Sequence, residues 1–313
     1  MNAKPKATRQ AFGEMLAELG ETHQEIVVLD ADLAKSTKSE LFGKKYQNRF
    51  FEMGIAEANM IGTGSGLALS GLTAFICSFG CFVTGRYDQI RMSIGYADAN
   101  VKIVGTHAGI GIGDDGHSQM GLEDVSLMRG IPGMSVYQPC DEIEARQIVK
   151  HLVENKGPAY LRLTRQALES VHDGKYQFKN GSIDVLSRGK KIAIFASGAA
   201  VQEVIKAREL LKKDGIDPTI VNIPSLKPLD AKQVLEIAST HTQIFSVEDH
   251  YITGGLGSIL AEIVATSRDA MGTKLTRLGV QDIPGESGDP LELYEKFGFS
   301  SSKIYQAVAN QQV

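Results

Sequence analysis

Apolar and polar positions follow two alternating patterns along most of the chain. Residues 8–19 place apolar side chains at the three- and four-residue spacing of an amphipathic helix. Residues 26–29 form a short apolar run that is typical of a buried strand and leads to Asp30 and Asp32. Further strands are expected at residues 50–53, 73–77, 101–105, 134–137 and 159–162. With helices between most of them, these runs predict an α/β domain whose parallel sheet has helices on both faces.

A polar stretch at residues 172–182 interrupts this alternation and indicates a linker or crossover. A second series follows it. Strands are expected at residues 192–196, 218–221 and 243–247, and helices at residues 199–212, 230–238 and 255–265. We therefore expect a first domain at residues 1–175, a linker at 176–190 and a smaller α/β domain at 191–313.

Composition narrows the class of protein. Of the 313 residues, 42% are hydrophobic and 22% are charged, which suits a globular protein with large cores. The net charge of -4 and the pI near 6.0 give no general attraction to nucleic acid or anionic membranes. No apolar run approaches the length of a membrane span and no signal peptide is evident, so a cytoplasmic location is expected. The cysteines suit a reducing compartment and are interpreted as buried small residues, with no metal bound by this chain: Cys77, Cys81 and Cys140.

Glu57 is the candidate catalytic residue. A strand-like segment ends near residue 53, and Glu57 then opens a helix that continues through Gly62, Gly64 and Gly66. Each glycine in a helix costs roughly 1 kcal/mol relative to alanine, so a subunit or a flat cofactor is expected to approach this helix closely. The alternative is that Glu57 only decorates a helix N-terminus, where an acid is favoured by about 0.3 to 1 kcal/mol.

A glycine-rich loop at residues 106–119 follows the expected strand at 101–105. It contains His107, Asp115 and Gln119, and loops that leave the carboxyl ends of parallel strands are where ligands bind. The loop matches neither a dinucleotide fingerprint nor a phosphate-binding P-loop. It could instead be a flexible surface loop, but the density of polar side chains favours a site for a polar ligand.

Two further groups of side chains could bind ligands. Phe79 and Phe82 stand three apart, which is typical of core residues on one helical face. An exposed phenylalanine at a strand end would instead suit stacking on a flat heterocycle. Arg9, Ser36 and Arg165 are candidate anion holders, because guanidinium groups bind phosphate in bidentate fashion. Each of the three could also be an ordinary surface residue.

Together these residues resemble the C-terminal section of transketolase. The shared motifs fall in order along nearly the whole chain, and they include Ile-Ala-Glu-x-Asn-Met at Glu57, Phe-x-x-Phe at Phe79, and Gly-x-His-x-Gly at His107. The resemblance implies the pyrimidine-binding domain of a thiamine-diphosphate enzyme, followed by a transketolase C-terminal domain.

The resemblance also implies roles for individual residues. Glu57 would hydrogen-bond the pyrimidine ring nitrogen of thiamine diphosphate, Phe82 would stack on that ring, and Phe79 and Asp32 would belong to the same cofactor site. Three residues would face the sugar: His107, Asp115 and Gln119. Three would hold its phosphate: Arg9, Ser36 and Arg165. Many transketolases carry a histidine at the position of Gln119, so this residue keeps hydrogen bonding but lacks a titratable group.

The implied activity is transfer of a two-carbon ketol unit from a ketose phosphate to an aldose phosphate. Complete transketolases carry a Gly-Asp-Gly…Asn motif that binds Mg²⁺ and the diphosphate, and this sequence has no such motif. We therefore expect a separate N-terminal subunit that ligates Mg²⁺, with self-association into an α2β2 assembly.

Two alternatives remain open from the sequence. The chain is similar in length and in its glutamate to the β subunit of a 2-oxo acid dehydrogenase, and His117-Ser118-Gln119 looks like a segment of that family. The glycine-rich loop and the candidate phosphate holders favour a phosphorylated sugar instead. The second alternative is a regulatory subunit that keeps the fold without turnover.

Overall fold

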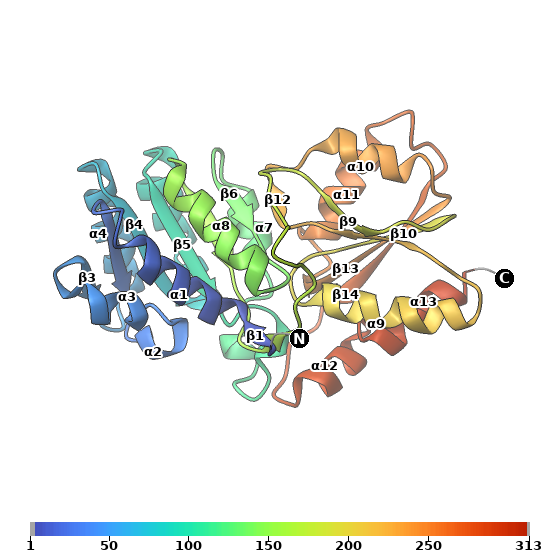
Figure 1. The fold of residues 1–313 in the computed structure, drawn as a ribbon, viewed down its shortest axis with the longest axis horizontal. Coiled ribbons are helices and arrows are strands. Elements are labelled where there is room, and N and C mark those ends of the chain that lie inside the picture. The colour runs from blue at the N-terminus through green and yellow to red at the C-terminus, as the bar shows by residue number, and fades with distance from the viewer. Residues whose placement is uncertain (1–3, 312–313) are drawn as a thin grey trace.

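The computed structural model describes residues 4–311, which form two large β-sheets flanked by helices (Figure 1) and a small two-stranded sheet. The α/β class expected from the sequence is therefore confirmed. The outermost residues of the two expected domains, 1–3 and 312–313, lie outside the described range. Within that range, no helix is both long and apolar enough to cross a membrane.

The larger sheet has seven strands in the order β12-β6-β7-β5-β4-β2-β3. Six of them come from the N-terminal part of the chain and are parallel to one another: β2 (Ile26–Asp30), β3 (Phe50–Glu52), β4 (Thr73–Phe79), β5 (Val101–Thr106), β6 (Ser135–Tyr137) and β7 (Ala159–Arg162). Every residue of β2, β4, β5 and β7 is buried, as expected for a parallel sheet covered on both faces.

Helices cover both faces of this sheet. Phe12 and Leu16 of the first helix pack with Ile148 on one face, and Met60 and Ile61 pack on the other. The helices are α1 (Thr8–Leu19), α2 (Ala34–Thr37), α3 (Glu40–Lys45), α4 (Glu57–Leu69), α5 (Gly80–Thr84), α6 (Tyr87–Gln89), α7 (Asp124–Arg129) and α8 (Glu142–Glu154). Shorter helical turns are η1 (Gln47–Arg49), η3 (Ile110–Ile112) and η4 (His117–Gln119), and η2 (Ile90–Tyr96) is a π-helix.

The second sheet has five strands in the order β14-β13-β10-β11-β9. They are β9 (Asp184–Ser187), β10 (Ile192–Ala196), β11 (Thr219–Asn222), β13 (Gln243–Tyr251) and β14 (Lys274–Val280). Its helices are α9 (Ala200–Lys213), α10 (Ala231–Ala238), α11 (Leu256–Ala265), α12 (Pro290–Phe297) and α13 (Ser301–Ala309). Figure 1 shows α10 and α11 on one side of this sheet and α9 and α13 on the other.

The structure differs from the expected elements mainly at sheet edges. The expected linker, residues 176–190, contains β9, which pairs antiparallel with β11. β14 was not expected, and β13 runs four residues beyond the expected end at 247. The short strand β12 (Ser225–Lys227) returns from the C-terminal part of the chain to the edge of the larger sheet. A two-stranded pairing of β1 (Lys6–Ala7) with β8 (Ala167–Leu168) was also missed. The domain boundaries stay a prediction.

His172 connects the N-terminal and C-terminal parts of the chain through two carboxylates. Its Nδ1 lies 2.9 Å from an Asp141 carboxylate oxygen, and its Nε2 lies 2.9 Å from Asp184 of β9. Burial lowers the pKa of His172, but hydrogen bonds to the two carboxylates outweigh it and raise the pKa to about 10. A protonated imidazolium therefore links the N-terminus of α8 to β9 at neutral pH.

Candidate active site

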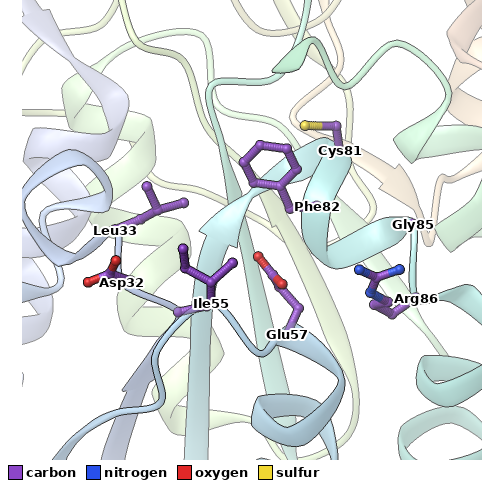
Figure 2. Close-up of a pocket in the computed structure, with 9 residues that line it drawn as sticks. Asp32, Leu33, Ile55, Glu57, Cys81, Phe82, Gly85 and Arg86 are labelled. Atoms are coloured by element: carbon purple, nitrogen blue, oxygen red, sulfur yellow. The ribbon is translucent and has the colours of Figure 1, made fainter. Parts of the chain in front are cut away.

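A cavity of about 470 Å³ opens at the carboxyl ends of the strands of the larger sheet (Figure 2). Loops after β2 and β3 and the short helix α5 form its walls. The lining residues are Ala31, Asp32, Leu33, Ile55, Glu57, Cys81, Phe82, Gly85 and Arg86. Ligands of open parallel sheets bind at this edge, so the cavity is the first candidate for the active site.

Glu57 is the first residue of α4 and is only 6% exposed. Its carboxylate accepts one long hydrogen bond, 3.4 Å from the Ser78 hydroxyl, and forms no salt bridge within residues 4–311. No side chain caps the N-terminus of α4. A buried carboxylate with so few partners has hydrogen-bonding capacity left for a ligand. Glu57 is thus an inward-facing group of the cavity rather than a solvent-facing decoration of the helix.

The three glycines of α4 have different explanations. A Cβ atom at Gly64 would lie 2.6 Å from Ile76 Cγ2 of β4, so the protein's own sheet requires this glycine. At Gly62 and Gly66 a Cβ would meet nothing within 4 Å. At Gly64 the close approach is thus made by β4 of the same chain and not by a subunit or a cofactor, which corrects the expectation, and the other two glycines leave an open stretch of helix surface.

Phe79, Phe82 and His107 form a continuous stack beside the cavity. The rings of Phe79 and Phe82 have centroids 5.5 Å apart and planes 11° apart, and Phe79 lies 3.8 Å from the His107 ring. Figure 2 shows the Glu57 carboxylate directed toward the Phe82 side of the cavity. Phe82 lines the cavity, whereas Phe79 does not line it and stacks between Phe82 and His107. The stack joins the cavity to the glycine-rich loop.

Asp32 lies on the cavity rim, and Asp30 holds the loop that carries it. The Asp32 backbone is left-handed, with φ of 62°, and its N–H donates to Glu52 Oε1 at 2.6 Å. Asp30 accepts hydrogen bonds of 2.7 Å from Leu33 N and from the Thr37 hydroxyl, and burial raises its pKa to about 6. The sequence placed Asp30 at a strand end but did not indicate this supporting role.

Arg9 and His107 meet next to the aromatic stack. Arg9 Nη1 lies 2.9 Å from His107 Nε2 and donates to the Ser36 carbonyl oxygen at 2.6 Å. Burial, and then the positive charges of Arg9 and Arg165, lower the pKa of His107 to about 3. A neutral His107 accepts from Arg9 at Nε2, because a guanidinium can only donate, and its Nδ1–H is left to donate to the Thr106 hydroxyl at 2.8 Å.

Arg165 completes a cationic corner with Arg9. Arg165 Nη1 donates to the Ile112 carbonyl oxygen at 2.6 Å and lies 3.9 Å from the exposed Asp115 carboxylate. Burial and the charge of Arg165 lower the pKa of Arg9. Arg9 Nε is buried and has no partner within residues 4–311. Two guanidinium groups with weak counter-charges and an unsatisfied N–H are suited to an anionic ligand.

Two predicted site residues, Ser36 and Gln119, do not place their side chains in hydrogen bonds at the site within the described part of the chain. Ser36 contributes its backbone carbonyl, rather than its hydroxyl, to Arg9. Gln119 is partly exposed in η4, and no hydrogen bond of its side chain is found within residues 4–311. Of the two histidines in the loop, His107 joins the site, while His117 Nδ1 accepts a hydrogen bond from Gly285 N at 3.0 Å.

Two backbone N–H groups of the glycine-rich loop are paired within the protein. Ile110 N and Gly111 N both donate to Asp249 from the C-terminal sheet. Sequence patterns do not predict this contact, because 139 residues separate Ile110 from Asp249. Cavity residues that were also missed are Ile55, Cys81 and Arg86, which are ordinary in type and become notable only through their place in the fold.

Comparison with known proteins identifies the family. The model described as "Transketolase, pyrimidine binding domain" matches residues 4–170, and that described as "Transketolase, C-terminal domain" matches residues 181–304. The chain belongs to the transketolase family. Apart from β12, the strands of the larger sheet thus belong to the pyrimidine-binding domain, and the five-stranded sheet belongs to the transketolase C-terminal domain.

Relatives of this transketolase-family chain include separate C-terminal sections. A Methanocaldococcus jannaschii protein provisionally named a transketolase C-terminal section is 38% identical over 309 residues, which cover 98% of this chain and 96% of that one. Transketolase of Rattus norvegicus is 37% identical over 306 residues, but the chain spans only 48% of its length. A solved structure described as "Split gene transketolase, inactive beta4 tetramer" has 40% identity and a TM-score of 0.89, with 97% of this chain and 98% of that chain covered.

These findings support the assignment of the chain as a transketolase subunit. Transketolases form a transferase family that generally depends on thiamine diphosphate. The reported relatives are transketolases, which favours this assignment over the β subunit of a 2-oxo acid dehydrogenase.

Proposed function

We propose that this chain is the C-terminal subunit of a split transketolase, which transfers a two-carbon ketol unit from a ketose phosphate to an aldose phosphate. The observation that carries the proposal is the buried Glu57 carboxylate in a cavity of about 470 Å³, beside Phe82. We further propose that a separate N-terminal subunit ligates Mg²⁺ and the diphosphate, and that the active assembly is a cytoplasmic α2β2 complex.

The cavity residues fit the pyrimidine ring of thiamine diphosphate. Glu57 has unused acceptor capacity inside the cavity, as one long hydrogen bond shows. Phe82 and Ile55 offer apolar surface for the faces of a flat ring. The Phe79 stack fixes the Phe82 ring from behind. When bound, thiamine diphosphate supplies the electron sink that cleavage of a carbon–carbon bond requires.

Each residue of the site then has a defined task. Glu57 holds or releases the proton shared with the pyrimidine ring nitrogen, as an acid–base group in a water-poor site does. Arg9 and Arg165 bind the sugar phosphate, and the unpaired Arg9 Nε can donate to it. Neutral His107, fixed by Thr106 and Arg9, orients the sugar without adding a charge. Asp115 and Gln119, which are exposed and partly exposed, contribute side chains that can hydrogen-bond the sugar hydroxyls.

The oligomeric proposal rests on the open face of α4 and on the related split-gene structure. That protein is described as an inactive β4 tetramer, and we infer that this chain alone is likewise inactive. Gly62 and Gly66 leave room for a neighbouring subunit at the helix that carries Glu57. A subunit at this face would close the cavity from bulk water.

Reconstitution tests the proposed function. The chain is mixed with its N-terminal subunit, thiamine diphosphate and Mg²⁺, and ketose phosphate consumption is followed with an aldose phosphate acceptor. A 2-oxo acid is offered in a parallel reaction. Ketol transfer without decarboxylation supports the proposal. Decarboxylation of the 2-oxo acid without ketol transfer would establish the dehydrogenase alternative, and cofactor binding without either reaction would favour the regulatory one.

A further inference from the structure

Asp249 of the C-terminal domain holds the backbone of the loop that contributes to the sugar site. It lies in β13 and is 2% exposed. Its Oδ1 accepts a hydrogen bond from Ile110 N at 2.6 Å. Its Oδ2 accepts from Gly111 N at 3.2 Å and from the Tyr294 hydroxyl at 3.0 Å. One carboxylate thus fixes the start of η3.

The glycines of the loop make this approach possible. Gly109 has φ of 90°, and a Cβ atom there would overlap the Asp249 carboxylate. A Cβ at Gly111 would overlap the Tyr294 hydroxyl and the Gln166 amide. The glycine-rich character at these two positions therefore serves packing against the C-terminal domain.

The far end of η3 holds a phosphate-binding residue of the proposed site. Ile112 O accepts the 2.6 Å hydrogen bond from Arg165 Nη1. The next residue, Gln166, donates from Nε2 to the Tyr294 hydroxyl at 2.5 Å. The guanidinium of Arg165 is thus held by η3, and the adjacent residue Gln166 is held by Tyr294. Asp249 hydrogen-bonds both η3 and Tyr294.

We propose that Asp249 is a positioning residue that sets the orientation of Arg165 and so determines the preference for phosphorylated sugars. The proposal rests on the proposed function, because it uses Arg165 as a phosphate holder. Asp249 does not line the cavity that contains Glu57, so it affects the anionic end of the sugar and not the cofactor end. The C-terminal domain then contributes to specificity without touching the substrate.

The substitution Asp249→Asn tests this in the reconstituted complex. Asparagine keeps the size of the side chain but cannot accept all three hydrogen bonds, since one oxygen becomes an NH₂ donor. We expect the KM for a ketose phosphate to rise about tenfold, as for loss of a buried hydrogen bond, with kcat and the KM for an unphosphorylated ketose changed less than about twofold. Tyr294→Phe should also raise the KM for the ketose phosphate relative to the KM for the unphosphorylated ketose, but by a smaller factor.

Glu248→Gln is the matched control. Glu248 neighbours Asp249 in β13, is equally buried, and accepts from Leu256 N at 2.7 Å and Gly257 N at 2.9 Å. It holds α11 instead of the loop. An equal KM rise for both ketoses in Asp249→Asn, or the same phosphate-selective rise in Glu248→Gln, would overturn the proposal.

Two measurements without turnover separate this inference from the proposed function. Hydrogen exchange at residues 110–112 should become faster in Asp249→Asn and stay unchanged in Glu248→Gln, and the affinity for inorganic phosphate should fall only in Asp249→Asn. If the wild-type complex transfers no ketol unit, the proposed function fails while these two results still decide the role of Asp249. Unchanged exchange and unchanged phosphate affinity would refute it.

Discussion

Removing the charge of Arg9 should weaken the binding of phosphorylated substrates much more than that of unphosphorylated ones. Arg9→Met keeps a long side chain in the half-buried position between Ser36 and His107 but deletes every donor of the guanidinium. A hydrogen bond to a charged group contributes about 1.5 to 3 kcal/mol, which corresponds to roughly 10- to 150-fold in affinity. We therefore expect the KM for a ketose phosphate to rise by that factor.

Steady-state kinetics of the reconstituted complex with paired donors provide the assay. The KM for an unphosphorylated ketose should change less than about threefold, because His107 keeps its hydrogen bond to Thr106 and the cofactor cavity remains in place. Arg146→Met is the control, because it also removes one positive charge. Arg146 lies outside the proposed site and pairs with Glu18 on the protein surface. Equal losses for the two donors, or an equal effect of Arg146→Met, would refute the anion site formed by Arg9 and Arg165.

Other predictions concern stability and the helix of Glu57. The pKa of His172 in the folded protein is raised to about 10, so its stabilisation is fully present below its ordinary pKa of 6.5 and is lost as the pH rises toward 10. Wild type should lose up to about 5 kcal/mol more stability than His172→Gln between pH 6.5 and 10, as measured by denaturant titration; parallel curves would contradict this. Gly64→Ala should lower the unfolding free energy by about 1 to 3 kcal/mol through its clash with Ile76, whereas Gly62→Ala should leave it unchanged or raise it by up to about 1 kcal/mol. The opposite order in thermal melts would show that the α4 packing is misassigned.

The sequence predicts the interior of the fold well, because buried strands read as continuous apolar runs and their covering helices show a clear helical spacing of apolar residues. The expected helix at residues 8–19 and the strand at 159–162 have the bounds of α1 and β7. The strands that were missed lie at sheet edges. β9 is half-buried throughout, and β14 mixes exposed and buried positions, so neither presents a continuous apolar run.

The sequence predicts those parts of the candidate site that depend on local sequence patterns, and not those that depend on contacts between distant segments. Glu57 and Phe82 follow different strands, and the rule that ligands bind at the carboxyl ends of parallel strands places them together. The position of Phe79 behind Phe82, and the use of the Ser36 carbonyl, depend on side-chain geometry. The contact of Asp249 with η3 joins two domains, and no local pattern reports such a pairing.

The most direct test of the account is the turnover of Glu57→Gln in the complex with the N-terminal subunit. Glutamine preserves the size of the side chain but cannot manage the proton of the pyrimidine ring, so we predict that ketol transfer falls by at least about 10²-fold while the melting temperature stays close to that of wild type. Glu144→Gln, which alters a buried carboxylate outside the cavity, should retain turnover once folded. Near-normal ketol transfer by Glu57→Gln would contradict the central role of this carboxylate.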